Sequence, residues 1–313
     1  MAMKNIAHLY VIGFVLTGIM AQQSIAGREN QKRVIDSLPS YLVGTYQPMN
    51  QVRPLEGANS SHGFFSLTSK MTPEQLKEFL SGSRSRRTVP MISLEPFPSV
   101  NRLTKTSQLH SDILSGKYDH EIKSIIILLK QERRPILIRF AHEMDVPGQY
   151  PWCFENANLY IDIYRYLHER AKTLAASNLI WVWSPQGRAT ADRYWPGDNQ
   201  VDIIGISVYA SKAFNERKEL KSFQTILGEK LWLSKRFNKP LIAAEVGVSG
   251  TDVEQEQWLQ NGLKHINKQE ARGFFYFQSA HPSFMPLKTG PEDWRLKGAA
   301  RRSFAMWAKG IKP

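Results

Sequence analysis

Cysteine is nearly absent from this chain, which excludes one common way of stabilising a fold. The 313 residues include a single cysteine, Cys153, so no disulfide can form within the chain. A domain of this length with 42% hydrophobic residues can bury a core that needs no cross-links. Cys153 stands in the aromatic stretch 150–154 without an activating base beside it, so we expect a packed side chain rather than a catalytic thiol.

Long apolar runs are also lacking. The longest one, residues 6–20, is too short for a comfortable membrane span and has no basic stop-transfer flank. Lys4 is the only charged residue before Arg28, and the small-residue sequence at 24–26 is typical of a cleavage site. This pattern indicates a secretory signal, and the absence of cysteine from it excludes a lipoprotein anchor.

Residues 1–26 are therefore predicted to be a signal peptide, and residues 27–313 the mature domain. We expect export to the periplasm or the cell exterior, with no stable membrane anchor. An uncleaved segment that lies in the membrane interface is the alternative. The exported domain is expected to be a monomer.

Acidic residues are outnumbered by basic ones, 28 against 41, which gives a formal net charge of +13. Such a charge favours polyanionic partners, including nucleic acid and acidic polysaccharides. The densest basic cluster, residues 83–87, is predicted to be a loop, and no nucleic-acid motif or zinc-ligand spacing accompanies it. We therefore expect a solvated basic surface, with no nucleic-acid partner, no metal and no cofactor.

The chain also lacks a linker rich in proline or serine, a break in composition and an internal repeat, so one domain is expected. Short apolar runs alternate with helical segments, and several runs are apolar at every position, as in a parallel sheet covered on both faces. The predicted strands are residues 41–46, 63–67, 89–94, 136–141, 179–183, 202–208, 241–244 and 273–277.

The segments between these runs have helical patterns. Thr72 is predicted to cap a helix that has Pro73 in its first turn, and apolar faces recur in residues 119–131, 156–175 and 223–237. Eight strand and helix units in one undivided stretch predict an α/β fold, specifically a single (β/α)8 barrel. The alternative is an open doubly wound sheet, but no glycine-rich phosphate-binding fingerprint follows the first strand.

Two glutamates, Glu143 and Glu245, lie about a hundred residues apart. Each stands at or just after the carboxyl end of an apolar, strand-like run. In a parallel barrel the carboxyl ends of all strands open at one mouth, where catalytic residues are found. Retaining glycoside hydrolysis needs two carboxyl groups about 5–5.5 Å apart at such a mouth. The alternative for each glutamate alone is a strand-end residue paired with a nearby base.

Arg139 lies four residues before Glu143. Side chains alternate along an extended strand, so Arg139 and Ala141 are predicted to share the lumen side with Glu143. A buried arginine needs a partner, and the carboxylate of the other strand end is a natural one. His142 could orient either the substrate or a carboxylate, or it could be a structural histidine satisfied within the fold.

Small residues surround Glu245, which would let a sugar approach closely, as a nucleophile requires. The second carboxyl group must instead donate a proton, so the two glutamates need different pKa values. Trp152 is a candidate for the poorly hydrated wall that would raise the pKa of Glu143. The hydroxyl of Tyr209 could hydrogen-bond the nucleophile and fix its rotamer.

Aromatic side chains near the predicted mouth are candidates for stacking on sugar faces, because pyranose C–H surfaces pack well on aromatic rings. They are Trp183, Trp195 and Phe277, although a lone tryptophan is more often part of the core. Glu95 closes the third predicted strand and adds an acidic group near the mouth. It could bind sugar hydroxyls or pair with a structural base.

Several segments together resemble glycoside hydrolase family 26. They are residues 139–144 (RFAHEM), 151–152 (PW), 181–185 (WVWSP), 194–198 (YWPGD), 201–209 (VDIIGISVY) and 244–247 (AEVG). The family consists mainly of β-mannanases built on a barrel, with catalytic glutamates on strands four and seven. The resemblance implies that Glu143 is the acid/base and Glu245 the nucleophile. It also implies that His142 and Tyr209 occupy active-site positions and that Trp183 belongs to the strand-five motif.

Two positions depart from the pattern of this family. Asp145 stands where asparagine is common, and Ser207 stands where mannanases can carry aspartate. The sequence therefore predicts endo-acting hydrolysis of a β-linked polysaccharide, with β-1,4-mannan as the first substrate. A hydrolase that trims an acidic exopolysaccharide, and a secreted carbohydrate-binding protein without catalysis, stay open as alternatives.

Overall fold

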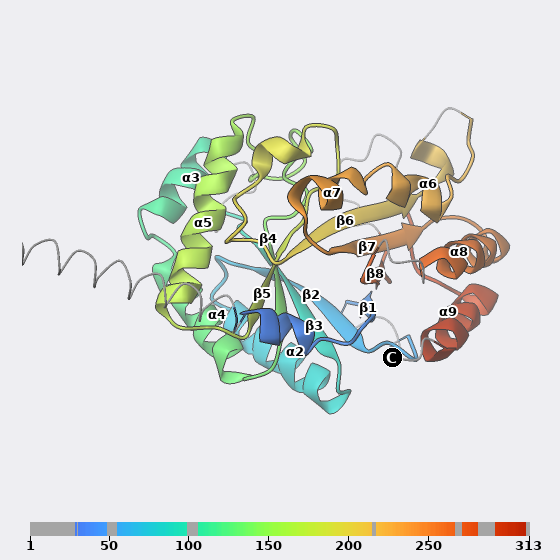
Figure 1. Cartoon of the computed structure of the whole chain (residues 1–313), viewed down its shortest axis with the longest axis horizontal. Helices are drawn as coiled ribbons and strands as arrows, with labels where there is room; N and C mark the ends of the chain where they lie inside the picture. Colours follow the sequence, from blue (N-terminus) through green and yellow to red (C-terminus); the bar gives the residue numbers. More distant parts are fainter. Residues whose placement is uncertain are drawn as a thin grey trace, which may run out of the picture.

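A computed structural model gives the arrangement of most of the chain (Figure 1). It describes residues 29, 31–48, 55–98, 106–214, 217–266, 271–280 and 292–310. The expected signal peptide, residues 1–26, lies outside the described residues. Among the residues described, no helix is both long and apolar enough to cross a membrane.

The predicted (β/α)8 barrel is confirmed: eight parallel strands follow one another in chain order, and β1 pairs with β8 to close the sheet. Each predicted strand is found with small shifts at its ends, and β6 and β7 extend further than predicted. The strands are β1 (Leu42–Tyr46), β2 (Ser60–Ser66), β3 (Val89–Glu95), β4 (Ile136–Phe140), β5 (Leu179–Trp183), β6 (Ile203–Ala210), β7 (Leu241–Val248) and β8 (Gly273–Phe277).

Helices surround the barrel, with α2 to α5 along one side and α6 to α9 along the other (Figure 1). The stretch predicted as one helix at 223–237 is instead two short helices, α6 and α7, joined by a turn at residues 229–231. The helical elements are α2 (Thr72–Ser85), α3 (Thr106–Leu114), α4 (Asp119–Gln131), α5 (Ala157–Thr173), the 3-10 turns η1 (Ala191–Tyr194) and η2 (Lys212–Phe214), α6 (Phe223–Gly228), α7 (Trp232–Phe237), α8 (Asp252–Ile266) and α9 (Gly298–Gly310).

Thr72 does not cap its helix as predicted. The cap position is Met71, which makes no side-chain capping hydrogen bond, and Thr72 is already inside the first turn. The Thr72 hydroxyl donates to the carbonyl of Ser66 at the end of β2 (2.5 Å). Thr72 is buried, and this hydrogen bond satisfies both its hydroxyl and the carbonyl at the end of β2.

Two apolar cores explain why the strands are apolar at successive positions. One lies between the strands and the helices, and the other fills the barrel lumen with side chains such as Leu137, Ile180 and Ile242. A helical segment at residues 31–36, dark blue in Figure 1, closes the amino end of the lumen. Val34, with its neighbours at 35 and 38, packs against the lumen core.

A bulge in β7 changes which side chains enter the lumen. Ile206 of β6 pairs with Ala243, but the next residue, Ser207, pairs with Glu245, so β7 carries one extra residue there. Ala244 lies in the lumen core, and strict alternation would then turn Glu245 toward the helices. Because of the extra residue, Glu245 also points into the barrel.

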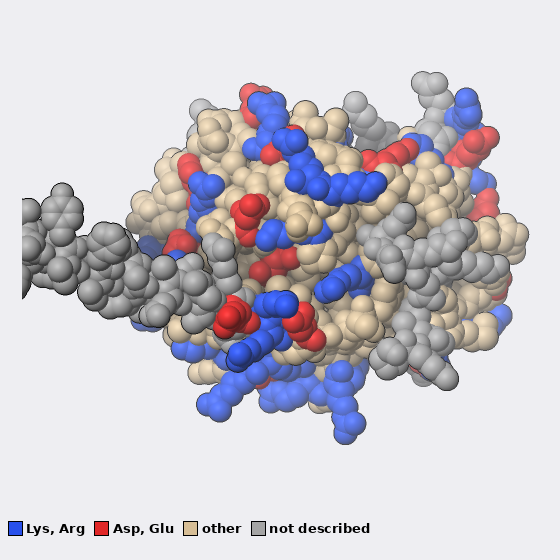
Figure 2. All heavy atoms as spheres, viewed as in Figure 1, with Lys and Arg blue, Asp and Glu red and all other residues tan. Residues whose placement is uncertain are grey.

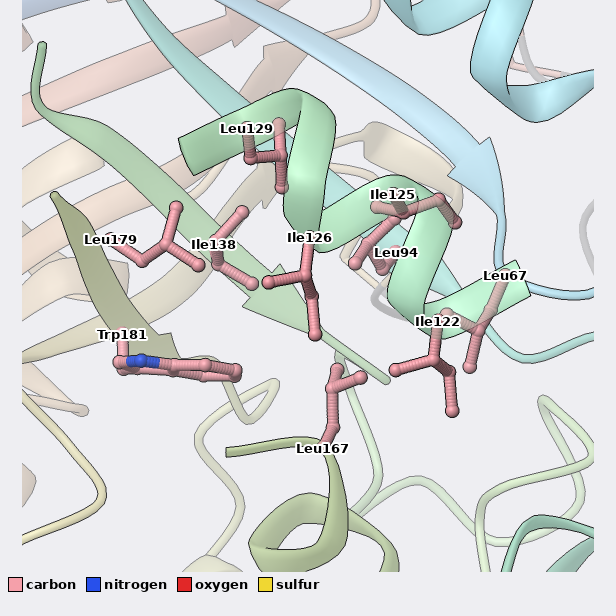
Figure 3. Close-up of a pocket in the computed structure, with 10 residues that line it drawn as sticks. All are labelled: Leu67, Leu94, Ile122, Ile125, Ile126, Leu129, Ile138, Leu167, Leu179 and Trp181. Atoms are coloured by element: carbon pink, nitrogen blue, oxygen red, sulfur yellow. The ribbon is translucent and has the colours of Figure 1, made fainter. Parts of the chain in front are cut away.

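An apolar cavity lies away from the barrel mouth. Ile122 and Ile126 project from α4 toward Ile138 of β4 and Trp181 of β5 (Figure 3). The space lies within the layer between helices and strands, and its lining carries no charged group. It is therefore a gap in the packing of that layer rather than a polar binding site.

Removal of the segment that closes the lumen should destabilise the barrel. A chain that begins at residue 39 loses the burial of Val34, Ile35 and Leu38, and also the side-chain bond from Gln31 to the carbonyl of Leu179. We expect its free energy of unfolding, measured with urea, to fall by about 2–4 kcal/mol. A chain that begins at residue 27 is the control and should match the full chain; equal stability of both truncations would contradict this role.

Candidate active site

Glu245 forms a buried ion pair with Arg139 inside the carboxyl end of the barrel. Arg139 Nη1 donates to Glu245 Oε1 at 2.5 Å, and the arginine side chain is 0% exposed. Neighbouring strands hold the guanidinium: its Nε donates to Ser184 Oγ (2.8 Å) and its Nη1 to Ser93 Oγ (3.3 Å). Arg139 thus neutralises the carboxylate charge and fixes the position of one oxygen.

The second oxygen of Glu245 accepts a hydrogen bond from Tyr209, whose Oη lies 2.5 Å from Oε2. Burial, together with the charge of Glu245, holds the pKa of Tyr209 well above its usual value, so the phenol stays protonated and donates. His142 Nε2 lies 3.9 Å from Oε1 of Glu245. Burial, followed by the nearby Arg139 charge, holds the His142 pKa well below its usual value, so this imidazole is neutral near pH 7.

Glu143 has different partners, and among the residues that the structure describes no cation lies within ion-pair distance of it. Its Oε1 accepts a hydrogen bond from Ser207 Oγ (2.5 Å), and its Oε2 accepts one from Gln149 Nε2 (2.6 Å). Burial is the main cause that raises the pKa of Glu143, and the negative charge of Glu245 raises it further. The two glutamates are therefore close enough to interact, and burial and this interaction both raise the pKa of Glu143.

The backbone after β4 explains how His142 and Glu143 both face the mouth. Ala141 and Glu143 have φ values of 48° and 53°, in the left-handed region that side chains other than glycine rarely occupy. The predicted alternation holds for Arg139, but it fails at Ala141, which packs in the core between strands and helices. Such backbone costs about 1 kcal/mol or more per residue and is typical of functional sites.

Trp152 is fully buried beneath the mouth. Its indole Nε1 donates to the carbonyl of His142 (2.7 Å), and its ring stacks on Tyr150 with centroids 4.6 Å apart. One face of Trp152 is thus covered by the half-buried Tyr150, which lies 5.0 Å from the ring of His142. Tyr150, rather than Trp152, presents an aromatic surface on this side of the mouth.

Trp183 and Trp195 belong to the layer outside the strands. Trp183 is fully buried and donates its Nε1 to the carbonyl of Tyr194 (3.1 Å). Trp195 stacks on Phe237 of α7, with ring centroids 3.9 Å apart, and its edge meets Trp183. Trp183 therefore has no open face, and the contacts of Trp195 favour a packing role.

Phe277 lies at the end of β8 in an aromatic group that the sequence only partly suggested. Its ring stacks on Tyr46 of β1 (4.8 Å) and lies 6.1 Å from Tyr209. Burial and then the charges of Glu95 and Glu245 raise the pKa of Tyr46 to about 12, which puts Glu95 on the same side of the mouth. Tyr46 and Phe277 are half-buried, so part of this aromatic surface is accessible.

Asp145 holds a loop. Its two carboxylate oxygens accept hydrogen bonds from the backbone N–H groups of Gln186, Gly187 and Arg188, at 2.7, 3.0 and 2.8 Å. This buried carboxylate is saturated by the segment after β5 and is not available to a sugar. Within the described ranges, no three His, Cys, Asp or Glu side chains are grouped so that they could hold a metal ion.

A closed parallel barrel has two buried carboxyl groups at its mouth, one of them paired with a guanidinium, and this arrangement is typical of a glycoside hydrolase. The chain belongs to glycosyl hydrolase family 26, whose sequence model matches residues 103–268. The predicted resemblance is confirmed.

Curated relatives carry two different activities in their names. A β-1,3-xylanase, TXYA, from Vibrio sp is 28% identical over 164 residues, which is 50% of this chain and 33% of that protein. A mannan endo-1,4-beta-mannosidase from Bacillus subtilis (strain 168) is 28% identical over 130 residues, or 38% of this chain and 32% of the relative. The matched region thus spans about a third of each relative's length.

Solved structures support the fold over nearly the whole chain. The GH26 β-mannanase BoMan26A from Bacteroides ovatus superposes with a TM-score of 0.63 at 15% identity, covering 91% of this chain and 93% of the other. GH26C from Muricauda sp. MAR_2010_75 gives 0.62 at 17% identity, with 90% and 88% covered. At these identities the likeness concerns the barrel itself.

The Arg139–Glu245 pair can be tested by a double-mutant cycle on stability. Arg139→Met should lower the free energy of unfolding in urea by about 3–5 kcal/mol, because it leaves a buried carboxylate unpaired. Adding Glu245→Gln should then cost less than it does in the wild-type background. Additive effects would contradict direct coupling, and Lys309→Met, at an exposed pair with Glu56, is a control that should change stability little.

Proposed function

We propose that this protein is an endo-acting, retaining glycoside hydrolase that cleaves β-linked polysaccharide by double displacement, with Glu143 as acid/base and Glu245 as nucleophile. The observation that carries the proposal is the contrast between the two carboxyl groups. Glu245 is paired with a buried guanidinium, whereas burial and the charge of Glu245 raise the pKa of Glu143. One group is thus suited to attack and the other to donate a proton.

In the first step, Glu245 Oε2 or Oε1 attacks the anomeric carbon as the bond to the leaving oxygen breaks. Glu143 gives its proton to that oxygen, and a covalent glycosyl ester forms on Glu245. Arg139 and Tyr209 orient the attacking carboxylate through their two short hydrogen bonds. Arg139 and Tyr209 stay in place in the ester intermediate, so they can stabilise the carboxylate charge when it returns to Glu245 in the second step.

In the second step, the ionised Glu143 takes a proton from a water molecule that attacks the anomeric carbon. The ester bond breaks, and the carboxylate charge on Glu245 is again stabilised by Arg139 and Tyr209. Esterification of Glu245 removes its negative charge, which is one of the causes that raise the pKa of Glu143. The pKa of Glu143 therefore falls in the intermediate, so the same residue can act first as acid and then as base.

We propose that Tyr46, Tyr150 and Phe277 contact sugar rings, and that neutral His142 donates to or accepts from a sugar hydroxyl. Each is at the mouth and close to one of the two carboxyl groups through the contacts above. Glu95 is a further candidate for hydroxyl binding. Trp183 and Trp195 are left out of this surface because of their packing.

The proposed substrate is β-1,4-mannan, in line with the name of the Bacillus subtilis relative. β-1,3-xylan is a second candidate, because two curated relatives are named β-1,3-xylanases. Both polymers are neutral. An aromatic surface with few charged groups suits a neutral chain better than a polyanion.

The densest basic cluster lies away from the cleft and so does not favour an acidic polymer there. Lys and Arg side chains gather along the lower edge of the molecule in Figure 2, over α2 and α4. The arginines at 84, 86, 87 and 133 lie near the loops that precede β3 and β4, and thus at the amino end of the barrel, away from the mouth. Ser207 is likewise engaged with Glu143 rather than offered to a uronate group.

The catalytic domain is proposed to comprise residues 27–313 and to be exported after loss of residues 1–26. A binding protein without catalysis is the competing class. It would need the aromatic surface but would gain nothing from a buried cation on one carboxyl group and a desolvated environment on the other. The paired carboxyl groups therefore favour an enzyme.

Glu245→Ala and Glu143→Gln should each lower turnover by at least about a thousandfold, because each removes an essential chemical step. Reducing-sugar release should be measured on mannan, β-1,3-xylan, mixed-linkage glucan and an acidic exopolysaccharide, and polymer binding by affinity electrophoresis. Binding should persist in both variants.

Glu169→Gln is the matched control, since Glu169 is exposed near the carboxyl end of α5, which lies toward the amino end of the barrel and away from the mouth. It should retain wild-type turnover. A fully active Glu245→Ala variant would contradict the nucleophile assignment. Turnover of the acidic polymer alone, abolished by salt, would overturn the neutral-substrate proposal.

A further inference from the structure

A buried lysine approaches the acid/base from outside the barrel. Lys230 lies in the turn between α6 and α7 and is 9% exposed. Its Nζ donates to the carbonyl of Ser207 at 2.6 Å. No carboxylate lies within 4 Å of it among the described residues, so its charge is compensated only at longer range.

The strand pairing explains why this position is open to a side chain. β5 and β6 pair only through Val182 with Ile203 and Trp183 with Ile204. Ser207 lies three residues beyond this pairing, where β5 has ended and its chain has turned into the loop held by Asp145. Lys230 Nζ therefore binds β6 at a point that lacks a strand partner on the β5 side.

Gly187 provides the space for the lysine stem. A Cβ placed on Gly187 would lie 2.7 Å from Lys230 Cδ and 2.9 Å from its Cγ, closer than such atoms can approach. The φ of Gly187 is +100°, and its N–H donates to Asp145 Oδ2. The carboxylate of Asp145 thus fixes the loop so that the glycine faces the lysine.

These contacts form a continuous chain that ends on Glu143. Lys230 holds the carbonyl of Ser207, and the hydroxyl of the same serine donates to Glu143 Oε1 at 2.5 Å. Burial lowers the pKa of Lys230 overall. The negative charge of Glu143 opposes this lowering more than any other charge does, and that of Asp145 comes next. The lysine and the glutamate therefore interact both through Ser207 and through space.

We infer that Lys230 is a positioning residue for the acid/base: it fixes Ser207 against Glu143 and adds a positive charge that limits how far the carboxyl group favours its proton. The inference rests on the proposed function of Glu143. The acid must give up its proton in the first step and act as a base in the second. A pKa raised without limit by burial would make the second role slow.

Other groups also act on Glu143, and the test must separate Lys230 from them. The charged groups are Glu245 from β7, Arg139 from β4, and Asp145 from the loop after β4. The titratable side chains nearby are Tyr150, Cys153 and Tyr209. Two further charges act on the pKa of Lys230 itself: that of Glu229 raises it, and that of Arg188 lowers it. None of these changes in a substitution at 230.

The decisive variant is Lys230→Met, which keeps the shape of the stem and removes the charge and the donor. Loss of a nearby cation disfavours the ionised carboxylate, so the pKa of Glu143 should rise, by about 0.5–1 unit. The pKa is measured by 13C carboxyl NMR on glutamate-labelled protein without substrate, with the signal assigned through Glu143→Gln. The alkaline limb of kcat/KM should move up by the same amount.

Kinetics should separate positioning from binding. Lys230→Met should lower kcat about tenfold while KM stays within about twofold, because the lysine acts on the acid/base and touches no sugar. Lys230→Arg, which keeps the charge, should retain most of the wild-type Glu143 pKa. Lys230→Gln is a second neutral variant and should raise the pKa of Glu143 as Lys230→Met does. It replaces Lys230→Met in the test if that variant does not fold.

Lys130→Met is the matched control. Lys130 also donates its Nζ to a backbone carbonyl, that of Leu174 (2.8 Å), but it does so in the last turn of α4 at the amino end of the barrel. It should leave the pKa of Glu143 and the kinetics unchanged.

A folded neutral variant at 230 with an unchanged Glu143 pKa would overturn the inference, even if its unfolding midpoint were lower, because that is the result of a purely structural lysine. The NMR titration needs no turnover. Absence of turnover on all polymers would refute the proposed function while the shift in pKa still tested the effect of Lys230 on Glu143.

Discussion

The buried ion pair between Arg139 and Glu245 is the interaction on which the mouth of this barrel depends. A guanidinium with no exposure to water must be compensated, so the arginine constrains where the carboxylate can lie. Ser93 of β3 and Ser184, the residue that follows β5, hold the arginine from either side of β4. The bulge at Ala244 turns Glu245 into the lumen to meet it. Residues from three neighbouring strands or their ends, and an irregularity in a fourth strand, thus position the contact between Arg139 and Glu245.

The second carboxyl group derives its character from the same pair. Glu245 is bound by a cation, yet its charge still reaches Glu143 and, together with burial, raises that pKa. Strained backbone at Ala141 and Glu143 turns the Glu143 side chain toward the mouth, and Ser207 and Gln149 then hold its oxygens. The chemistry is therefore encoded as much in local irregularities of β4 and β7 as in the residue types.

Regular features of the sequence predicted the regular features of the structure. Apolar runs located all the strands, and alternation placed Arg139 in the lumen, because both follow from the period of a strand. Irregular features were not predictable in this way. The bulge at Ala244 and the left-handed Ala141 break that period, and neither has a glycine or asparagine to signal it. Burial of Trp183 and the reach of Lys230 depend on tertiary packing between distant segments.

The stereochemistry of hydrolysis tests the central claim most directly. A β-linked oligosaccharide that the enzyme cleaves should be followed by 1H NMR during the first minutes, before mutarotation equilibrates the new reducing end. Double displacement through a nucleophilic Glu245 predicts that the β anomer forms first. First formation of the α anomer would mean a single displacement by water, and would contradict the account of Glu245 as a nucleophile held by Arg139.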